Sequence, residues 1–216
     1  MKDVKEKDGT YEKLVEEYKG GLFRHKYTIK NGKYHGPYET YHKNGQLRDI
    51  TTYKNGKFHG PDIRFFKNGQ LHLSRNYKND RLDGLYLKFF ANGQLKTRFY
   101  LKNHSLHGLS ESHFENGQLE TINTYKNGKL HGLSEIYFED GQLARRRYYK
   151  NGKSVETHEQ YLSNGELLSK GIYDEEGVKH YSYFRETNPP RDEIVKGIQS
   201  FKEMIKDIPS KDGGKK

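Results

Sequence analysis

Four histidines recur at fixed positions and are the first residues of this sequence that could do chemistry. They are His35, His59, His107 and His131, each directly before a glycine. Two imidazoles that share one zinc ion must each come within about 2.1 Å of it. Equivalent positions in successive β-hairpins lie two strands, or about 9.5 Å, apart. The spacing therefore favours a local structural role for each histidine, and we expect no metal site and no cofactor.

Two serines stand in a repeated sequence that could resemble a nucleophile motif. Ser110 and Ser134 both follow His-Gly-Leu in the sequence HGLSE. A nucleophilic serine needs a general base that a third group holds in place. A motif that recurs at the repeat period is more simply the start of a strand. The glycines stand singly and form no phosphate-binding loop, so we predict no catalytic residue and no enzymatic activity.

Basic and aromatic side chains interleave, as they do in proteins that hold single-stranded nucleic acid by stacking. The best local candidate is Arg145-Arg146-Arg147 before Tyr148-Tyr149, in a chain of formal net charge +10. Alternate residues of a strand point to opposite faces, however, so the triplet does not form one patch. Many lysines stand in KNGK turns, where they keep loops soluble. Nucleic acid and an anionic membrane surface are therefore alternative partners, and a protein is the main one.

All these candidates are set on one strict period of 24 residues, which is the sequence signature of stacked structural units. The glycine of the NGQ segment recurs at Gly45, Gly69, Gly93, Gly117, Gly141 and Gly165. The leucine two residues later recurs at Leu47, Leu71, Leu95, Leu119, Leu143 and Leu167. A tyrosine closes the second strand at Tyr53, Tyr77, Tyr125, Tyr149 and Tyr173, with Leu101 in one copy.

The regular unit contains two Asn-Gly pairs, which predict type I′ hairpin turns because both central residues take positive φ. Two copies depart from this pattern, with Asn79-Asp80 and Asn103-His104 in place of Asn-Gly. Between the turns, apolar and polar residues alternate as in strands. Leu47 and Tyr53 are six residues apart, so a regular strand would place them on one face. Stacked hairpins would then form leucine and tyrosine ladders. The predicted fold is all-β: an elongated single-layer antiparallel sheet of stacked 24-residue β-hairpins, plus a C-terminal α-helix.

Composition and the breaks in the period predict the organisation of the 216 residues. About a third of them are apolar, against about 45–50% in a typical globular domain, which argues against a thick two-layer core. We expect a degenerate N-terminal capping repeat at 1–26, a hairpin array of six clear repeats at 27–187, an amphipathic helix at 188–208 and a disordered tail at 209–216.

The predicted C-terminal helix carries an apolar stripe that could bind a partner or cap the last hairpin. Its residues are Ile194, Ile198, Phe201, Met204 and Ile205. The sequence has no cysteine, and its start has no apolar signal-peptide region. We therefore expect a cytoplasmic or otherwise intracellular protein.

The unit YKNGKxHGxxxxYxxNGQL resembles the variant MORN repeat. That repeat is found in bacterial proteins labelled YwqK-type antitoxins and in long arrays of some large DNA viruses. The resemblance implies an extended sheet that acts as a scaffold or protein-interaction module, and a structural component of a larger assembly, such as a viral particle, is one such role. An antitoxin or immunity role, in which the protein neutralises a toxin by binding it, is the alternative. End-to-end self-association of the array is a further expectation.

Overall fold

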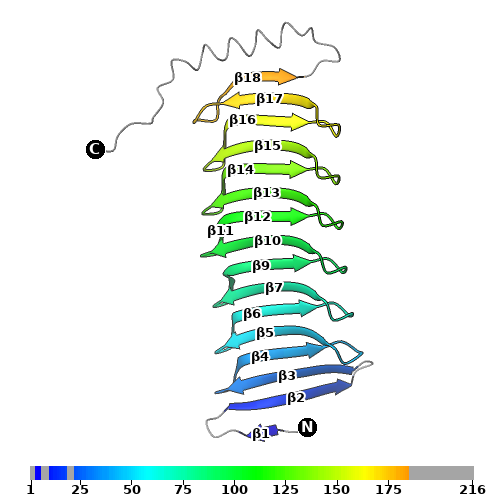
Figure 1. Ribbon diagram of the computed structural model, residues 1–216. Helices are drawn as coiled ribbons and strands as arrows, with labels where there is room; N and C mark the ends of the chain where they lie inside the picture. The colour runs from blue at the N-terminus through cyan, green and yellow to red at the C-terminus, as the bar shows by residue number, and fades with distance from the viewer. Residues whose placement is uncertain (1–2, 6–9, 19–21, 185–216) are drawn as a thin grey trace, which may run out of the picture.

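A computed structural model gives the structure of residues 3–5, 10–18 and 22–184. These residues form one open antiparallel sheet in which the strands pair in the order of the sequence (Figure 1). The strands are β1 (Asp3–Lys5), β2 (Thr10–Tyr18), β3 (Leu22–Lys30), β4 (Lys33–Tyr41), β5 (Leu47–Lys54), β6 (Lys57–Phe65), β7 (Leu71–Lys78), β8 (Arg81–Leu82), β9 (Gly84–Phe89), β10 (Leu95–Lys102), β11 (Ser105–Leu106), β12 (Gly108–His113), β13 (Leu119–Lys126), β14 (Lys129–Tyr137), β15 (Leu143–Lys150), β16 (Lys153–Tyr161), β17 (Leu167–Tyr173) and β18 (Lys179–Phe184).

The predicted all-β fold, a single antiparallel sheet built from hairpins, is confirmed. The sheet is elongated, with β1 and β18 at opposite ends (Figure 1). The predicted helix at 188–208, with its stripe from Ile194 to Ile205, lies outside the described residues, and so does the predicted tail at 209–216. The part of the chain that the structure describes contains no helix, and so none that could span a membrane.

The KNG turns join the two strands of each hairpin as predicted. Asn55 and Gly56 both have positive φ, 54° and 82°, which is the signature of a type I′ turn. Where the sequence has Asn79-Asp80 the backbone keeps this shape, with φ of 52° and 68°. The hairpin register therefore survives the loss of the glycine.

The NGQ loops differ from the prediction of a type I′ turn. Among their residues Gly45 has positive φ, 84°, whereas Asn44 does not. The Gly45 N–H donates to the His42 carbonyl and the His42 N–H to the Gln46 carbonyl, as in a three-residue loop that ends in a left-handed glycine. The reason lies in the Asn44 side chain, because its oxygen accepts the Gln46 N–H at 3.1 Å and its amide donates to the Lys67 carbonyl of the next repeat.

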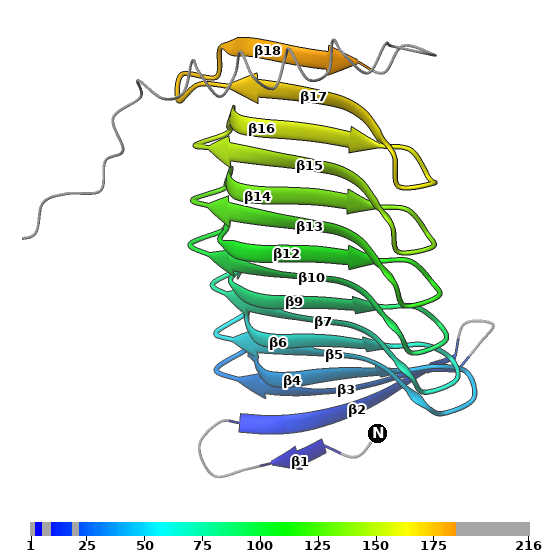
Figure 2. The same ribbon diagram turned by 45° about the horizontal axis from the view of Figure 1, so that its top comes forward.

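Two irregularities interrupt each regular hairpin. The register shifts between Thr51 and Tyr53, opposite Gly60, which has φ of 102°. It shifts again where Tyr41 pairs with Leu47 and Thr40 with Asp49, which leaves Arg48 as an extra residue. Such bulges bend strands, and Figure 2 shows the long strands curving along their length.

The second bulge overturns the prediction that the repeated leucine and tyrosine share a face. Leu47 pairs with Tyr41, and directly opposed residues of an antiparallel pair share a face. Tyr53 instead contacts the ring of Tyr38, which stands three positions from Tyr41 and so points to the other side. One extra residue shifts the alternation by one, so that the leucines and the tyrosines lie on opposite faces of the sheet.

The apolar core is thin, as expected of one layer. Among the described side chains, the buried hydrophobic ones are Ile29, Leu73 and Val155. The repeated leucines are half-buried. Stability therefore rests on contacts between neighbouring hairpins along both faces.

Candidate functional site

The face that carries the repeated tyrosines, here called the tyrosine face, presents three columns of side chains that run along the sheet. The outer column, next to the KNG turns, is the most apolar. Its members are Ile29, Tyr34, Tyr53, Phe58, Tyr77, Leu82, Leu101, Leu106, Tyr125, Leu130, Tyr149, Ser154 and Tyr173. The predicted tyrosine ladder thus lies in this column.

Rings of the outer column touch between neighbouring strands where a glycine stands opposite the tyrosine, as it does for Tyr53 and Tyr77. Tyr53 pairs with Gly36, which has no side chain, so the ring of Tyr34 reaches Tyr53 with 5.3 Å between centroids. Phe58 continues the contact, 4.9 Å from Tyr53 and 5.3 Å from Tyr77. Tyr34 and Phe58 are nevertheless 38% and 37% exposed. These rings form an apolar surface that is open to solvent.

The middle and inner columns are mostly polar and change from copy to copy. The middle column contains Tyr27, Tyr38, Thr51, Asp62, Arg75, Tyr86, Phe99, Ser110, Asn123, Ser134, Arg147, His158, Gly171 and Ser182. The inner column contains His25, Thr40, Asp49, Arg64, Leu73, Lys88, Thr97, Ser112, Thr121, Ile136, Arg145, Gln160, Ser169 and Phe184. The scaffold therefore displays a different polar pattern at each level.

A hollow of about 190 Å³ lies on this face over β4 to β7, with Asp62 in its lining. The Asp62 carboxylate is 2% exposed. It accepts hydrogen bonds from Arg75 Nε at 2.5 Å and Thr51 Oγ1 at 3.0 Å, and Arg64 Nη2 lies 3.8 Å away. Beside it, burial and the neighbouring Tyr34 raise the pKa of Tyr53. The Asp62 carboxylate therefore pairs with side chains of the sheet itself.

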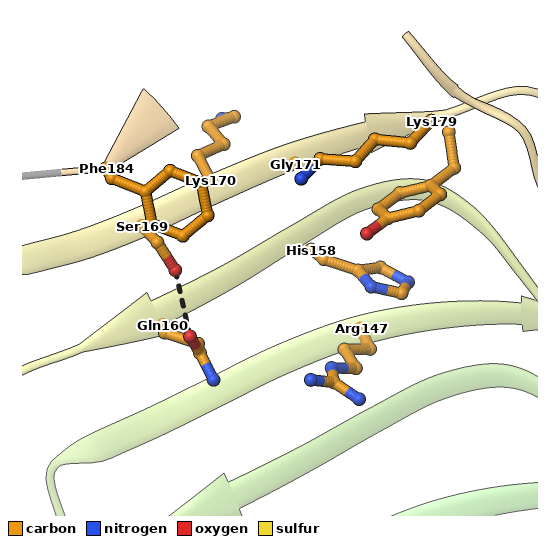
Figure 3. Close-up of a pocket in the computed structure, with 9 residues that line it drawn as sticks. Arg147, His158, Gln160, Ser169, Lys170, Gly171, Lys179 and Phe184 are labelled. Carbon is orange, nitrogen blue, oxygen red and sulfur yellow. Dashed lines mark hydrogen bonds between the residues drawn. The ribbon is translucent and has the colours of Figure 1, made fainter. Parts of the chain in front are cut away.

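A second hollow, of about 120 Å³, lies on the same face near the other end of the sheet and is lined by Arg147, His158, Gln160 and Ser169 among others (Figure 3). Ser169 Oγ donates to Gln160 Oε1 at 2.9 Å. His158 lies against the ring of Tyr173, with 4.4 Å between centroids. Burial lowers the pKa of His158, and the positive charge of Arg147 lowers it further. The histidine is therefore neutral at pH 7.

The opposite face carries a different set of contacts. Glu135, 8% exposed at its side chain, accepts from Arg146 Nε at 2.7 Å and from the Tyr137 hydroxyl at 2.6 Å. Burial and Glu135 together raise the pKa of Tyr137 to about 12. Glu159 contacts both Arg146, at 3.8 Å, and Lys170, at 3.0 Å. These ion pairs link β14 to β17 across the sheet.

The predicted structural histidines lie beside the turns. His59 Nδ1 is 3.3 Å from the amide oxygen of Asn79 in the turn of the next repeat. His35 makes the same contact with Asn55, and His131 makes it with Asn151. His107 differs, because its Nδ1 has no hydrogen-bond partner among the described atoms. Within 3–5, 10–18 and 22–184, no three histidine, cysteine or acidic side chains gather as metal ligands.

The remaining candidates of the sequence are dispersed over the two faces. Ser110 and Ser134 both stand in the middle column, where Ser134 Oγ donates to Asn123 Oδ1 at 2.6 Å. Arg146 lies on the opposite face from Arg145 and Arg147, as strand alternation predicts. Gly45 and its equivalents lie in the NGQ loops. The predicted partner-binding stripe from Ile194 to Ile205 is outside the described residues.

Sequence reasoning missed Asp62 as a site residue, although a signal existed. Asp62 is the second residue after the glycine of the HG pair and stands between the apolar residues Pro61 and Ile63. Its burial depends on Thr51 and Arg75 in the two neighbouring strands. Only the cross-strand register reveals that set.

A single open sheet of antiparallel hairpins with a 24-residue period defines a β-hairpin repeat protein. Residues 34–55, 82–103, 106–127 and 130–153 match the family model described as MORN repeat variant. The chain is thus a protein with four repeats of the MORN repeat variant, and the resemblance carried by its HG, KNGK and NGQL segments is confirmed. A search of curated proteins gave no significant match.

Proposed function

We propose that the protein is a non-enzymatic interaction module that binds a protein partner on its tyrosine face. One observation carries the proposal: equivalent positions of the middle column carry four residue types in six copies, whereas most turn residues repeat. At that position successive repeats have Tyr38, Asp62, Tyr86, Ser110, Ser134 and His158. A repeated scaffold with a non-repeated surface suits a ligand whose own chemistry does not repeat.

A ligand with a repeating charge would favour a different surface. The phosphates of a nucleic acid and the headgroups of an anionic membrane present the same charge at every level of the array. Such a ligand is best met by a cation in each repeat. The middle column instead carries a cation at Arg75 and at Arg147, and Arg75 is neutralised by Asp62. The surface of a folded protein or a peptide matches this uneven pattern.

The polar groups on this face support binding over catalysis. Asp62 is held by Arg75 and Thr51. The ring of His158 lies 3.4 Å from the Tyr148 carbonyl, within reach of a hydrogen bond from Nε2. A general base must be free to take a proton from a substrate. Exposed aromatic rings such as Phe58, in contrast, are typical anchors of protein interfaces.

Substitutions on the two faces test this proposal. We expect Tyr34→Ala with Phe58→Ala to reduce partner capture from the lysate of the source cells at least about tenfold, since buried aromatic anchors contribute about 2 kcal/mol or more. The matched control is Leu85→Ala with Leu109→Ala on the opposite face, where both side chains are also exposed, at 47% and 46%. Quantitative mass spectrometry compares the two variants. Equal loss in both, or loss in the control alone, would contradict binding by the tyrosine face.

Nucleic acid is the second candidate, because Arg145 and Arg147 lie together on the tyrosine face beside the Tyr149 ring. It predicts that the affinity for a single-stranded oligonucleotide falls steeply with salt, by about 0.7 in the log–log slope for each phosphate contact. An antitoxin role is a special case of the main proposal in which the partner is a toxin. Competition between the captured partner and the oligonucleotide separates the two candidates.

A further inference from the structure

Two arginines on the tyrosine face have no acidic partner in the described structure. Arg145 and Arg147 flank Arg146 in β15, and Arg146 pairs with Glu135 on the opposite face. Across the strands Arg145 stands beside Ile136 and Gln160, and Arg147 beside Ser134. All of these neighbours are uncharged. Two half-buried guanidinium groups without a counter-charge are costly unless a ligand supplies one.

The hollow beside Arg147 is lined by hydrogen-bond donors together with Gly171 and the ring of Phe184, and it has no carboxylate in its lining. Gly171 stands between His158 and Ser182 in the middle column, and the ring of Tyr173 lies over it. Ser169 donates to Gln160 Oε1, which leaves the Gln160 amide nitrogen for a ligand. Lys179 borders the hollow from the neighbouring strand β18 (Figure 3).

The chemistry and the size of the hollow define the group that it could take. Lys170 also lines it, but the Lys170 ammonium pairs with Glu159 on the opposite face at 3.0 Å. The cations without an acidic partner among the described residues are Arg147 and Lys179 in the lining, and Arg145 beside Gln160. The Lys179 ammonium lies 5.3 Å from the centroid of the Phe184 ring. A volume of about 120 Å³ holds about four waters at their liquid volume. A carboxylate fits such a space, and a guanidinium group matches a carboxylate with two parallel hydrogen bonds.

We propose that Arg145, Arg147 and Lys179 form an anion subsite that binds a carboxylate of an acidic segment in the protein partner. This inference deepens the proposed function and rests on it. Gln160, which lines the hollow, contributes a neutral donor to the subsite. The subsite binds the acidic segment at one end of the partner's contact surface, and the exposed rings near β4 to β7 bind the apolar part of that surface.

The distribution of charge favours an acidic peptide over a nucleic acid strand. From β10 to β14 the middle column contains Phe99, Ser110, Asn123 and Ser134, and the inner column contains Thr97, Ser112, Thr121 and Ile136. None of these side chains is charged. A nucleic acid backbone needs a cationic track along its length. A local cluster at one end of the face instead matches one or two acidic side chains.

A labelled octaglutamate peptide and the full-length protein test the subsite by fluorescence anisotropy at low salt, with octaglutamine as the neutral peptide. We expect Arg145→Gln with Arg147→Gln to weaken octaglutamate binding at least about tenfold, because a hydrogen bond to a charged group contributes about 1.5–3 kcal/mol. Lys179 is exposed, so Lys179→Gln should weaken binding about threefold. The His158 ring protons should shift in NMR spectra on binding, since the ring borders the hollow.

The matched control changes the net charge by the same amount elsewhere. Lys126→Gln with Lys129→Gln alters two exposed lysines of the turn between β13 and β14 and should leave octaglutamate binding within about twofold. Equal weakening in the control would show diffuse attraction and overturn the subsite. Tighter, arginine-dependent binding of an oligothymidylate of equal charge would overturn the acidic-peptide assignment.

The outcomes also separate the subsite from the proposed function. Circular dichroism checks that the double arginine variant folds, and Lys179→Gln tests the subsite independently because it alters only an exposed side chain. If octaglutamate does not bind, but Tyr34→Ala with Phe58→Ala still reduces partner capture, the subsite is wrong and the binding face stands. If the arginine substitutions leave octaglutamate binding unchanged and the aromatic substitutions leave partner capture unchanged, both the subsite and the binding face are wrong.

Discussion

Removing the Asp62 carboxylate should destabilise the protein more than removing a neutral hydrogen-bonding group on the tyrosine face. Asp62 accepts hydrogen bonds from Arg75 and Thr51 while its own side chain is 2% exposed. A hydrogen bond to a charged group contributes about 1.5–3 kcal/mol. Arg64 adds little, because its side chain is 45% exposed and water can replace the contact. After Asp62→Ala the Arg75 guanidinium, 21% exposed, regains some water. We therefore expect a loss of about 3 kcal/mol.

The repeat supplies a matched control at the equivalent position. Ser134 stands three periods after Asp62 and donates to Asn123 at 2.6 Å. Both of these groups are neutral, so Ser134→Ala should cost about 1 kcal/mol. Urea unfolding followed by far-UV circular dichroism measures both losses. Hydrogen exchange then locates them, at β5 to β7 for Asp62 and at β13 to β15 for Ser134, since repeat arrays can open locally.

A double-mutant cycle isolates the ion pair itself. Arg75→Ala should cost about 3–5 kcal/mol, because it leaves the buried carboxylate of Asp62 without its main partner. The variant that carries both changes should lose less than the sum of the two by about 1–3 kcal/mol. An Asp62→Ala loss no larger than that of Ser134→Ala, or strict additivity in the cycle, would refute the reasoning.

Three further changes have predicted signs. Glu156 occupies the place of the HG glycine with φ of 58°, so Glu156→Gly should stabilise the protein by about 1 kcal/mol in urea unfolding; a loss would show that the side chain makes a contact of its own. Asn116 donates to the Glu139 carbonyl of the next repeat at 2.9 Å, whereas Asp140 has no amide to do so; Asp140→Asn should add about 0.5–1.5 kcal/mol, and an unchanged urea midpoint would contradict it. The pKa of Tyr137 is raised from 10.0 to about 12 in the folded protein. The contribution of its hydroxyl to the free energy of unfolding is therefore complete below pH 10 and is lost as the pH rises through about 12. The difference in stability between the protein and Tyr137→Phe should shrink over that range, and a constant difference would contradict this.

The sequence predicts the parts of this fold that depend on short-range chemistry. The KNG turns follow from two residues with positive φ, and they persist even where Asp80 replaces glycine. The bulges do not follow from alternation, because Arg48 is an ordinary strand residue whose extra position appears only when Tyr41 and Leu47 pair. One such residue reverses which face each later side chain occupies. Composition of the two faces was therefore beyond sequence reasoning.

The candidate site was less predictable than the fold for a related reason. The Arg145 to Arg147 triplet was visible as a basic run, and strand alternation correctly separates its members. What places Arg147 in a candidate site is the hollow that it lines together with Lys179, which lies three strands away in β18. Neither residue points to a site by itself. Sites on a repeat array arise between strands, and a single strand's sequence does not contain them.

The length of the tyrosine face limits which partners can use both of its contact regions. From Phe58 in β6 to Arg147 in β15 the sheet passes through β7, β9, β10, β12, β13 and β14. At about 4.8 Å for each step the separation is about 34 Å. An extended chain covers at most about 3.5 Å per residue, so a bridging segment needs about ten residues. A shorter peptide such as octaglutamate therefore reports on one region alone. Only a longer or folded partner gains from both, because the first contact raises the effective concentration at the second.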